Sequence, residues 1–304
     1  MNRYANILFD DTFKVVVCAP GNEALLIRII ELLIPGKHVK SLVLRDKENH
    51  GLSVSDKITT FDLYCTSENG EQFIVEMQYS AQNSFADRML CYSTYPIRAQ
   101  LAAKLSSMRE RRANGEKPDK MDYSLKPVYV VSMLNFSIKH SSPDALDNGL
   151  VSRYGILNAG NGETMTEALH FVYLELGRLV AKVDEPHKCK TLLEQFAYSL
   201  KYMHKLPQRP DGFDDPLLVE LYNATEFANW PPDKQLKYDD TMRTELDIIA
   251  IKTYAQEEGH REGLQEGRQE EKSEIAKKML AKGYNLEDIA DITGFTPSQV
   301  KELQ

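Results

Sequence analysis

The sequence predicts an α/β protein in which a mixed β-sheet is covered by helices on both faces. Two observations carry this prediction. Apolar residues recur at helical spacing in some segments, and they form short runs or alternate strictly in others. Over the first 140 residues these segments follow the order helix, three strands, helix, strand. A length of 304 residues suits about two domains, and 42% hydrophobic with 27% charged residues excludes bulk disorder.

Each element of this core has its own signal. In the first predicted helix, residues 23–34, apolar residues recur at helical spacing until Pro35-Gly36 ends the pattern. A long helical pattern at 84–112 contains Pro96, where we expect a bend because proline removes an intrahelical hydrogen bond. Four runs are predicted as strands, the last of them apolar enough to be buried on both faces: 38–45, 59–66, 72–78 and 127–136.

The signals weaken beyond residue 140. We expect a strand at 169–176, helices at 188–204 and 216–229, a charged helical stretch at 239–282, and three short helices within 273–304. Trp230-Pro231-Pro232 is expected to end the second of those helices. The predicted organisation is a core at 1–140, an α/β extension packed on it at 141–238, and a helical tail at 239–304.

The hairpin around Glu68-Asn69-Gly70 is the most informative stretch. A three-residue loop with Gly70 in the left-handed conformation pairs Ser67 with Glu71. This register gives one wholly apolar side, made by the pairs Cys65–Phe73, Leu63–Val75 and Phe61–Met77. The other side carries Tyr64 opposite Ile74 and Asp62 opposite Glu76, with Gln78 next along the strand. A two-residue turn would instead pair apolar with polar positions.

Asp62 and Glu76 are therefore expected to face each other with their β-carbons ~5 Å apart, where two like charges destabilise a sheet. Three arrangements would offset the repulsion: one acid is protonated, the pair is open to water, or a cation binds between them. Hard divalent ions such as Mg²⁺ prefer such oxygen ligands. The spacing fits a metal site and an exposed acidic pair on an edge hairpin equally well.

Around these residues the sequence resembles the PD-(D/E)XK nuclease superfamily. It is most similar to the recombination-promoting nuclease and transposase family of bacteria. The resemblance covers most of the chain and rests on an ordered set of motifs: Asp11 with Phe13-Lys14, Asp62, the run 74–78, Arg88 followed by Tyr92, the strand 126–131, Leu174-Glu175-Leu176, and the Glu-Gly-rich run 257–267.

The resemblance implies a Mg²⁺-dependent (or Mn²⁺-dependent) DNA endonuclease with an αβββαβ core that promotes recombination. Asp62 and Glu76 would hold the metal with the main-chain carbonyl of Met77, and a metal-activated water would attack the phosphodiester. Gln78 stands where the superfamily usually has lysine and would position water or phosphate, although an amide carries no charge. The alternative is a catalytically weak or inactive nuclease-fold protein that binds DNA and self-associates through its tail.

Other candidates each have a structural alternative. Arg88 and Tyr92, with Tyr95, share one helix face and would contact phosphate and bases, or would simply pack on the sheet. Lys14 would lie near a phosphate, or would be a surface amine. Asp11 and Glu23 are possible accessory residues near the metal, but acids at such positions also cap helices or favour the helix dipole.

Charge and targeting signals limit the remaining possibilities. A net charge of −8 argues against a protein that coats nucleic acid over its whole surface, although 88–126 carries nine cations against four anions. The Glu-Gly repeats at 258–267 fit self-association into a homo-oligomer, or a frayed linker. The segment 273–304 resembles a helix-turn-helix, but 259–304 has seven cations and nine anions, so a structural or oligomerising role is expected. No membrane span, secretory signal or paired cysteine spacing is present, so a reduced cytoplasm is the expected location.

Overall fold

The computed structural model describes residues 3–17, 19, 21–44, 62–116, 120–140 and 149–303. The chain divides into two compact units, Met1–Leu236 and Lys237–Gln304. Phe61, and with it the expected pair Phe61–Met77, lies outside the described residues.

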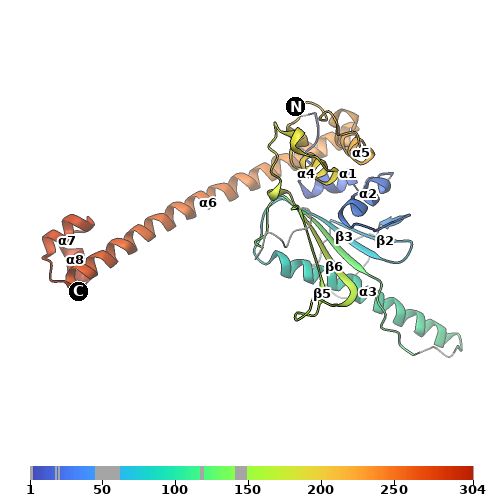
Figure 1. Cartoon of the computed structure of the whole chain (residues 1–304), viewed down its shortest axis with the longest axis horizontal. Coiled ribbons are helices and arrows are strands. Elements are labelled where there is room, and N and C mark those ends of the chain that lie inside the picture. The colour runs from blue at the N-terminus through green and yellow to red at the C-terminus, as the bar shows by residue number, and fades with distance from the viewer. Residues whose placement is uncertain are drawn as a thin grey trace. The chain divides into compact units, whose positions relative to one another are not determined.

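A six-stranded mixed sheet forms the centre of the first unit, which confirms the predicted fold class (Figure 1). Its order is β1-β2-β3-β4-β6-β5. β3–β4 and β4–β6 are parallel, and the other neighbours are antiparallel. The strands are β1 (Leu42–Leu44), β2 (Leu63–Ser67), β3 (Gln72–Gln78), β4 (Val128–Leu134), β5 (Val151–Leu157) and β6 (Thr164–Glu175). All seven residues of β4 are buried, as its continuous apolar run predicts for a strand covered on both faces.

Helices cover both faces of this sheet. They are α1 (Asp10–Val17), α2 (Glu23–Leu33), α3 (Phe85–Ala113), α4 (Leu192–Tyr202) and α5 (Pro216–Thr225). One face is covered by α3, which packs Phe85, Met89 and Tyr95 against sheet residues such as Ile74 and Val130. Figure 1 shows α1, α2, α4 and α5 on the opposite side. The site strand β3 is therefore reached by α1 from one side and by α3 from the other.

Four features differ from the sequence-based expectations. The eight-residue helix α1 and the strand β5 were not predicted, and β6 begins at Thr164 rather than at residue 169. In β5 the last four residues are exposed and one of them is Gly155, so this strand lacks the apolar alternation of a half-buried strand. The helix α5 ends at Thr225, well before Trp230, and Pro232 begins the next helix, where a missing N–H costs nothing.

The second unit is helical and has a small core of its own. Its helices are the far part of α6 (Pro232–Ala281), α7 (Leu286–Thr293) and α8 (Pro297–Glu302). Ala276 of α6 packs with Ile289, Phe295 and Val300. Asn285 caps α7, and Thr296 forms a capping box with Gln299 at the start of α8. The three predicted short helices are therefore present, the first of them as the end of α6. Across the described ranges, no helix is both long and apolar enough to cross a membrane.

Candidate functional site

The hairpin of β2 and β3 has the register that the sequence predicts. Gly70 adopts a left-handed φ of 78°, and its N–H donates to the carbonyl of Ser67 at 2.9 Å. The N–H of Ser67 donates to the carbonyl of Glu71 at 2.9 Å, and Tyr64 pairs with Ile74. A glycine in this conformation closes a three-residue loop with a bulge. The turn therefore fixes which side chains of the two strands share a face.

This register brings Asp62 and Glu76 together. The N–H of Asp62 donates to Glu76 Oε1, and the N–H of Met77 donates to Asp62 Oδ2, both at 2.9 Å. Asp62 is 7% exposed and Glu76 is 2% exposed. Each carboxylate thus accepts a hydrogen bond from the main chain of the other strand or its extension. The pair is buried, so the exposed acidic pair that the sequence left open is wrong.

A lysine from α1 neutralises part of this charge. Lys14 Nζ lies 2.9 Å from Asp62 Oδ1, and the lysine side chain is 31% exposed. Burial lowers the pKa of Lys14, but attraction to Asp62, together with Asp10 and Asp11, outweighs it, so the pKa is raised. The ammonium group therefore stays charged at neutral pH. The structure places Lys14 at the acidic pair, not at a remote surface position.

Glu76 has the most perturbed carboxyl group of this cluster. Burial, followed by the negative charge of Asp62 and a smaller contribution from Asp10, raises the pKa of Glu76 to about 8; the Asp62 N–H and Arg88 act in the opposite direction. Glu76 is consequently protonated at neutral pH when no metal ion is bound. Its neighbours within hydrogen-bond reach are polar, so the carboxyl is not enclosed by hydrocarbon alone.

Gln78 links this carboxyl group to α3. Its Nε2 donates to Glu76 Oε2 at 3.1 Å, and its Oε1 accepts from Arg88 Nη2. Arg88 also donates through Nη1 to Gln82, and its guanidinium lies 5.7 Å from the centre of the Tyr92 ring. The buried Nε of Arg88 has no hydrogen-bond partner among the described residues. Arg88 is thus held at the site, and its Nε–H group is left without an acceptor there.

The other candidates from the sequence lie outside this cluster. Asp11 is exposed on α1 and influences Lys14 only through its charge. Glu23 begins α2 and forms no hydrogen bond or ion pair with any residue described. Tyr95 is buried against Tyr64, with ring centres 5.8 Å apart, so it belongs to the core.

Sequence reasoning missed Asp10, which acts on both Lys14 and Glu76. Asp10 and Lys14 are four residues apart, so they share a face of α1, and this spacing could have identified the acid had the helix been predicted. Sequence reasoning also missed Gln82, which precedes α3. The N-cap residue of this helix, Ser84, has a left-handed φ of 60°, a strained conformation that is often found beside functional sites.

The donor set suits a hard divalent cation. Mg²⁺ is commonly bound by one or two carboxylates and keeps several waters. Asp62 and Glu76 supply such oxygens, and each carboxylate oxygen retains acceptor capacity beyond the one hydrogen bond it makes here. The N–H of Met77 points at Asp62, and because the N–H and C=O of one strand residue point to the same edge, its carbonyl does too. Within the described residues no cluster of three or more His, Cys, Asp or Glu side chains could hold a metal, so main-chain and water oxygens would complete the shell.

Two family models match the chain. Residues 8–255 match the family described as PD-(D/E)XK nuclease family transposase, and residues 269–304 match the Rpn/YhgA-like nuclease family, C-terminal HTH domain. No curated protein and no solved structure gives a significant match. The first match contains every candidate site residue, and the second covers α7 and α8. Because the first model covers most of the sequence, and the second resembles only its last helices, the chain belongs to the PD-(D/E)XK nuclease family transposases.

Proposed function

We propose that the chain is a Mg²⁺-dependent or Mn²⁺-dependent DNA endonuclease that hydrolyses phosphodiester bonds, in keeping with a role in promoting recombination. One observation supports this above the others. Two buried carboxyl groups, Asp62 and Glu76, are joined across neighbouring strands beside a lysine and an arginine. A perturbed acidic pair with cations at hand is typical of an active site. Asp62, Glu76 and the carbonyl of Met77 are the proposed metal ligands.

The bound cation would supply a Lewis acid and lower the pKa of a bound water. The chain's own residues set the conditions for this. Glu76 is protonated in the metal-free protein and must lose its proton to serve as a ligand. Asp62 is held by the N–H of Met77, which fixes the direction of one carboxylate oxygen and leaves the other facing Lys14.

The positive charge that the superfamily's usual lysine would provide has two sources here. Gln78 is neutral, but it lies between Glu76 and Arg88 and orients both. Lys14 and Arg88 approach the acidic pair from α1 and α3, respectively. We propose that these two cations contact the phosphate that is cut, and that Tyr92, beneath the Arg88 guanidinium, lines the DNA path.

Supercoiled-plasmid nicking with Mg²⁺ tests the proposal. Asp62→Asn and Glu76→Gln should each lower the nicking rate by about a hundredfold or more, and EDTA should abolish it. Glu71→Gln is the matched control, because it removes a carboxylate from the same hairpin that pairs with Lys37 at 2.7 Å instead. This control should nick at the unaltered rate. Equal nicking by all variants would overturn the proposal.

A second candidate function is favoured by the neutral residue at position 78. With Gln78, and with all four carboxylate oxygens already hydrogen-bonded or ion-paired, the fold could bind DNA and assemble without cutting it. In this case the full chain would bind a DNA duplex and nick no plasmid with either metal. The Glu-Gly stretch of α6 is the proposed contact between copies, since Gly259, Gly263 and Gly267 have open space around them.

A further inference from the structure

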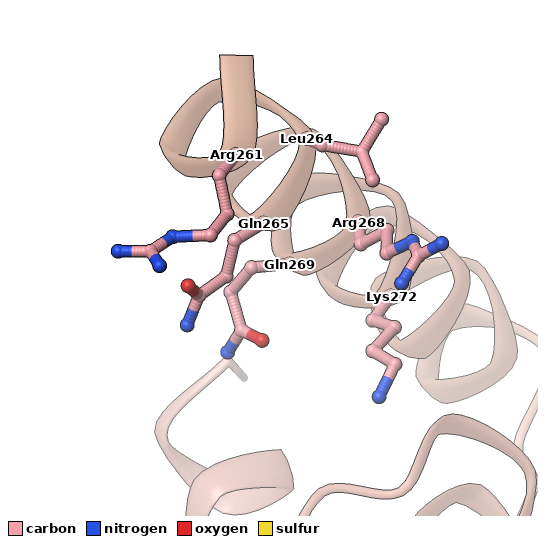
Figure 2. A pocket seen from close by; sticks show the side chains of 6 residues that line it. All are labelled: Arg261, Leu264, Gln265, Arg268, Gln269 and Lys272. Carbon is pink, nitrogen blue, oxygen red and sulfur yellow. The ribbon is translucent and has the colours of Figure 1, made fainter. Parts of the chain in front are cut away.

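A basic groove lies within the second unit, which contains none of the residues proposed for cleavage (Figure 2). Its volume is about 380 Å³. Six side chains of α6 line it: Arg261, Leu264, Gln265, Arg268, Gln269 and Lys272. The groove thus carries three cations and two amides, and no acidic residue lines it.

The helix separates most of its charges by face, with Glu262 and Glu271 at the two borders of the basic side. Arg261, Gln265, Arg268 and Lys272 follow the spacing i, i+4, i+7 and i+11, which places them on one side of an α-helix. Glu266, Glu270 and Glu274 are four residues apart and fall on the other side. The net negative charge of this segment therefore hides a positive stripe. This is why counting charges along the sequence gave no sign of a nucleic-acid contact.

The basic stripe runs directly into the helix-turn-helix core. Four and seven residues beyond Lys272, the same face carries Ala276 and Met279, which pack with the core of α7 and α8. Lys272 also lies at the turn between those helices, because a Cβ added to Gly294 would stand 3.3 Å from its Nζ. The groove and the helix-turn-helix therefore form one continuous surface of the second unit.

Two of the three cations are free to bind an anion. Arg261 pairs with Glu258 on the same helix. Arg268 and Lys272 form no ion pair with any residue that the structure describes. By contrast, α8 has little to offer for reading bases: Gln299, the central polar residue of that helix, uses its side-chain oxygen to accept from the N–H and hydroxyl of Thr296.

We propose that this groove binds the phosphate backbone of duplex DNA and that α6, not α8, supplies the main contacts. From Arg261 to Lys272 the helix rises about 16 Å, along which one strand of DNA presents about five phosphates. Guanidinium groups are suited to bidentate phosphate binding, and glutamine amides donate to phosphate and sugar oxygens. Contacts of this kind fix the position of DNA without reading its sequence. The groove thus holds DNA independently of cleavage.

The test measures binding by the full chain in EDTA, so that it does not depend on the nuclease proposal. The probe is a fluorescein-labelled duplex of about 20 base pairs, titrated at several salt concentrations between about 50 and 200 mM. The groove variant carries Arg261→Gln, Arg268→Gln and Lys272→Gln. The matched control carries Lys277→Gln, Lys278→Gln and Lys282→Gln, which are exposed, lie in the same unit outside the groove, and change the net charge equally.

The groove variant should lose about tenfold or more in affinity. The slope of log K against log salt should fall by about 1.8 if Arg268 and Lys272 alone contact phosphate, and by about 2.7 if DNA also displaces Glu258 from Arg261. The control should lose at most about half of that slope. Equal losses in the two variants, or no loss in the groove variant, would overturn the proposal. So would unchanged DNA binding with lost self-association in sedimentation, because the groove would then be a contact between copies.

A pair of single substitutions covers the case in which a triple variant folds poorly. Glu258→Gln releases Arg261 from its ion pair and should raise DNA affinity about twofold to fivefold. Glu274→Gln breaks the exposed pair with Lys278 outside the groove and removes the same charge, so it should raise affinity less. If the two variants bind equally well, the groove has no special role.

Discussion

Glu76→Gln should remove the loss of stability that the Glu76 carboxyl group imposes on the metal-free first unit as the pH rises. Glu76 holds its proton up to about pH 8 in the folded chain, whereas an unfolded glutamate releases it near 4.5. The folded state therefore binds more protons between these values, and its free energy of unfolding falls as the pH rises. At about 1.4 kcal/mol for each pH unit, the loss between about pH 5 and about pH 8 is roughly 3 kcal/mol. The variant has no proton to release, so most of this loss should disappear.

Trp230 makes the measurement specific. It is the only tryptophan of the chain and is buried within the first unit, so urea unfolding followed by its fluorescence in EDTA reports on the unit that contains Glu76. Glu163→Gln, an exposed change on the same sheet's periphery, controls for the loss of any carboxyl group. If the unaltered chain and Glu76→Gln lose the same free energy from pH 5 to pH 8, Glu76 is ionised in the folded state and the reasoning fails.

Divalent metal extends this test. At about pH 8, excess Mg²⁺ should restore stability to the unaltered chain, because a cation at the pair favours the ionised form of Glu76. At a hundred times its dissociation constant the gain should be about 2.7 kcal/mol. Glu76→Gln should gain much less. An equal gain in both would place metal binding elsewhere in the chain.

Three further substitutions have defined outcomes. Lys14→Gln should lower the rate of plasmid nicking about tenfold or more, because it removes a charge that lies 2.9 Å from Asp62; an unchanged rate would exclude Lys14 from the reaction. Glu175→Ala should lower the free energy of unfolding by about 3–5 kcal/mol, because it removes a fully buried carboxylate and leaves its two ion-pair partners unpaired. These partners are His140 (Nε2–Oε1, 2.6 Å) and Arg178 (Nε–Oε2, 3.1 Å). A loss below about 1 kcal/mol in urea unfolding would contradict this. Gly177→Ala should lower the free energy of unfolding by about 1–3 kcal/mol, since its Cβ would stand 2.6 Å from the main chain just after β4. An unchanged melting temperature would show that the main chain there moves to make room for the methyl group.

The central hairpin was predictable because two independent patterns agree on it. Alternation along 61–66 and 72–78 sets which residues share a face, and Gly70 sets the loop length. Either pattern alone would leave the register ambiguous by one residue. Their agreement places Asp62 against Glu76, and the structure has the same register.

Other parts were not predictable from local pattern. The helix α1 has eight residues, too few for a clear helical period, and it is held by packing against β3 rather than by its own propensity. With α1 unassigned, the resemblance could place Lys14 near the site, but its ion pair with Asp62 could not be predicted. The basic groove of α6 was hidden for a different reason, because its cations and the neighbouring acids cancel when they are counted along the chain.

The length of the turn at Gly70 also determines which face of the sheet carries Asp62. Removing or adding one residue there would turn the Asp62 side chain to the other side of the sheet, while Glu76 stayed in place. No substitution of the residues around Asp62 and Glu76 would separate the two carboxyl groups so completely. This loop should instead tolerate insertions of two residues, because a shift by two keeps each side chain on the same face of the sheet.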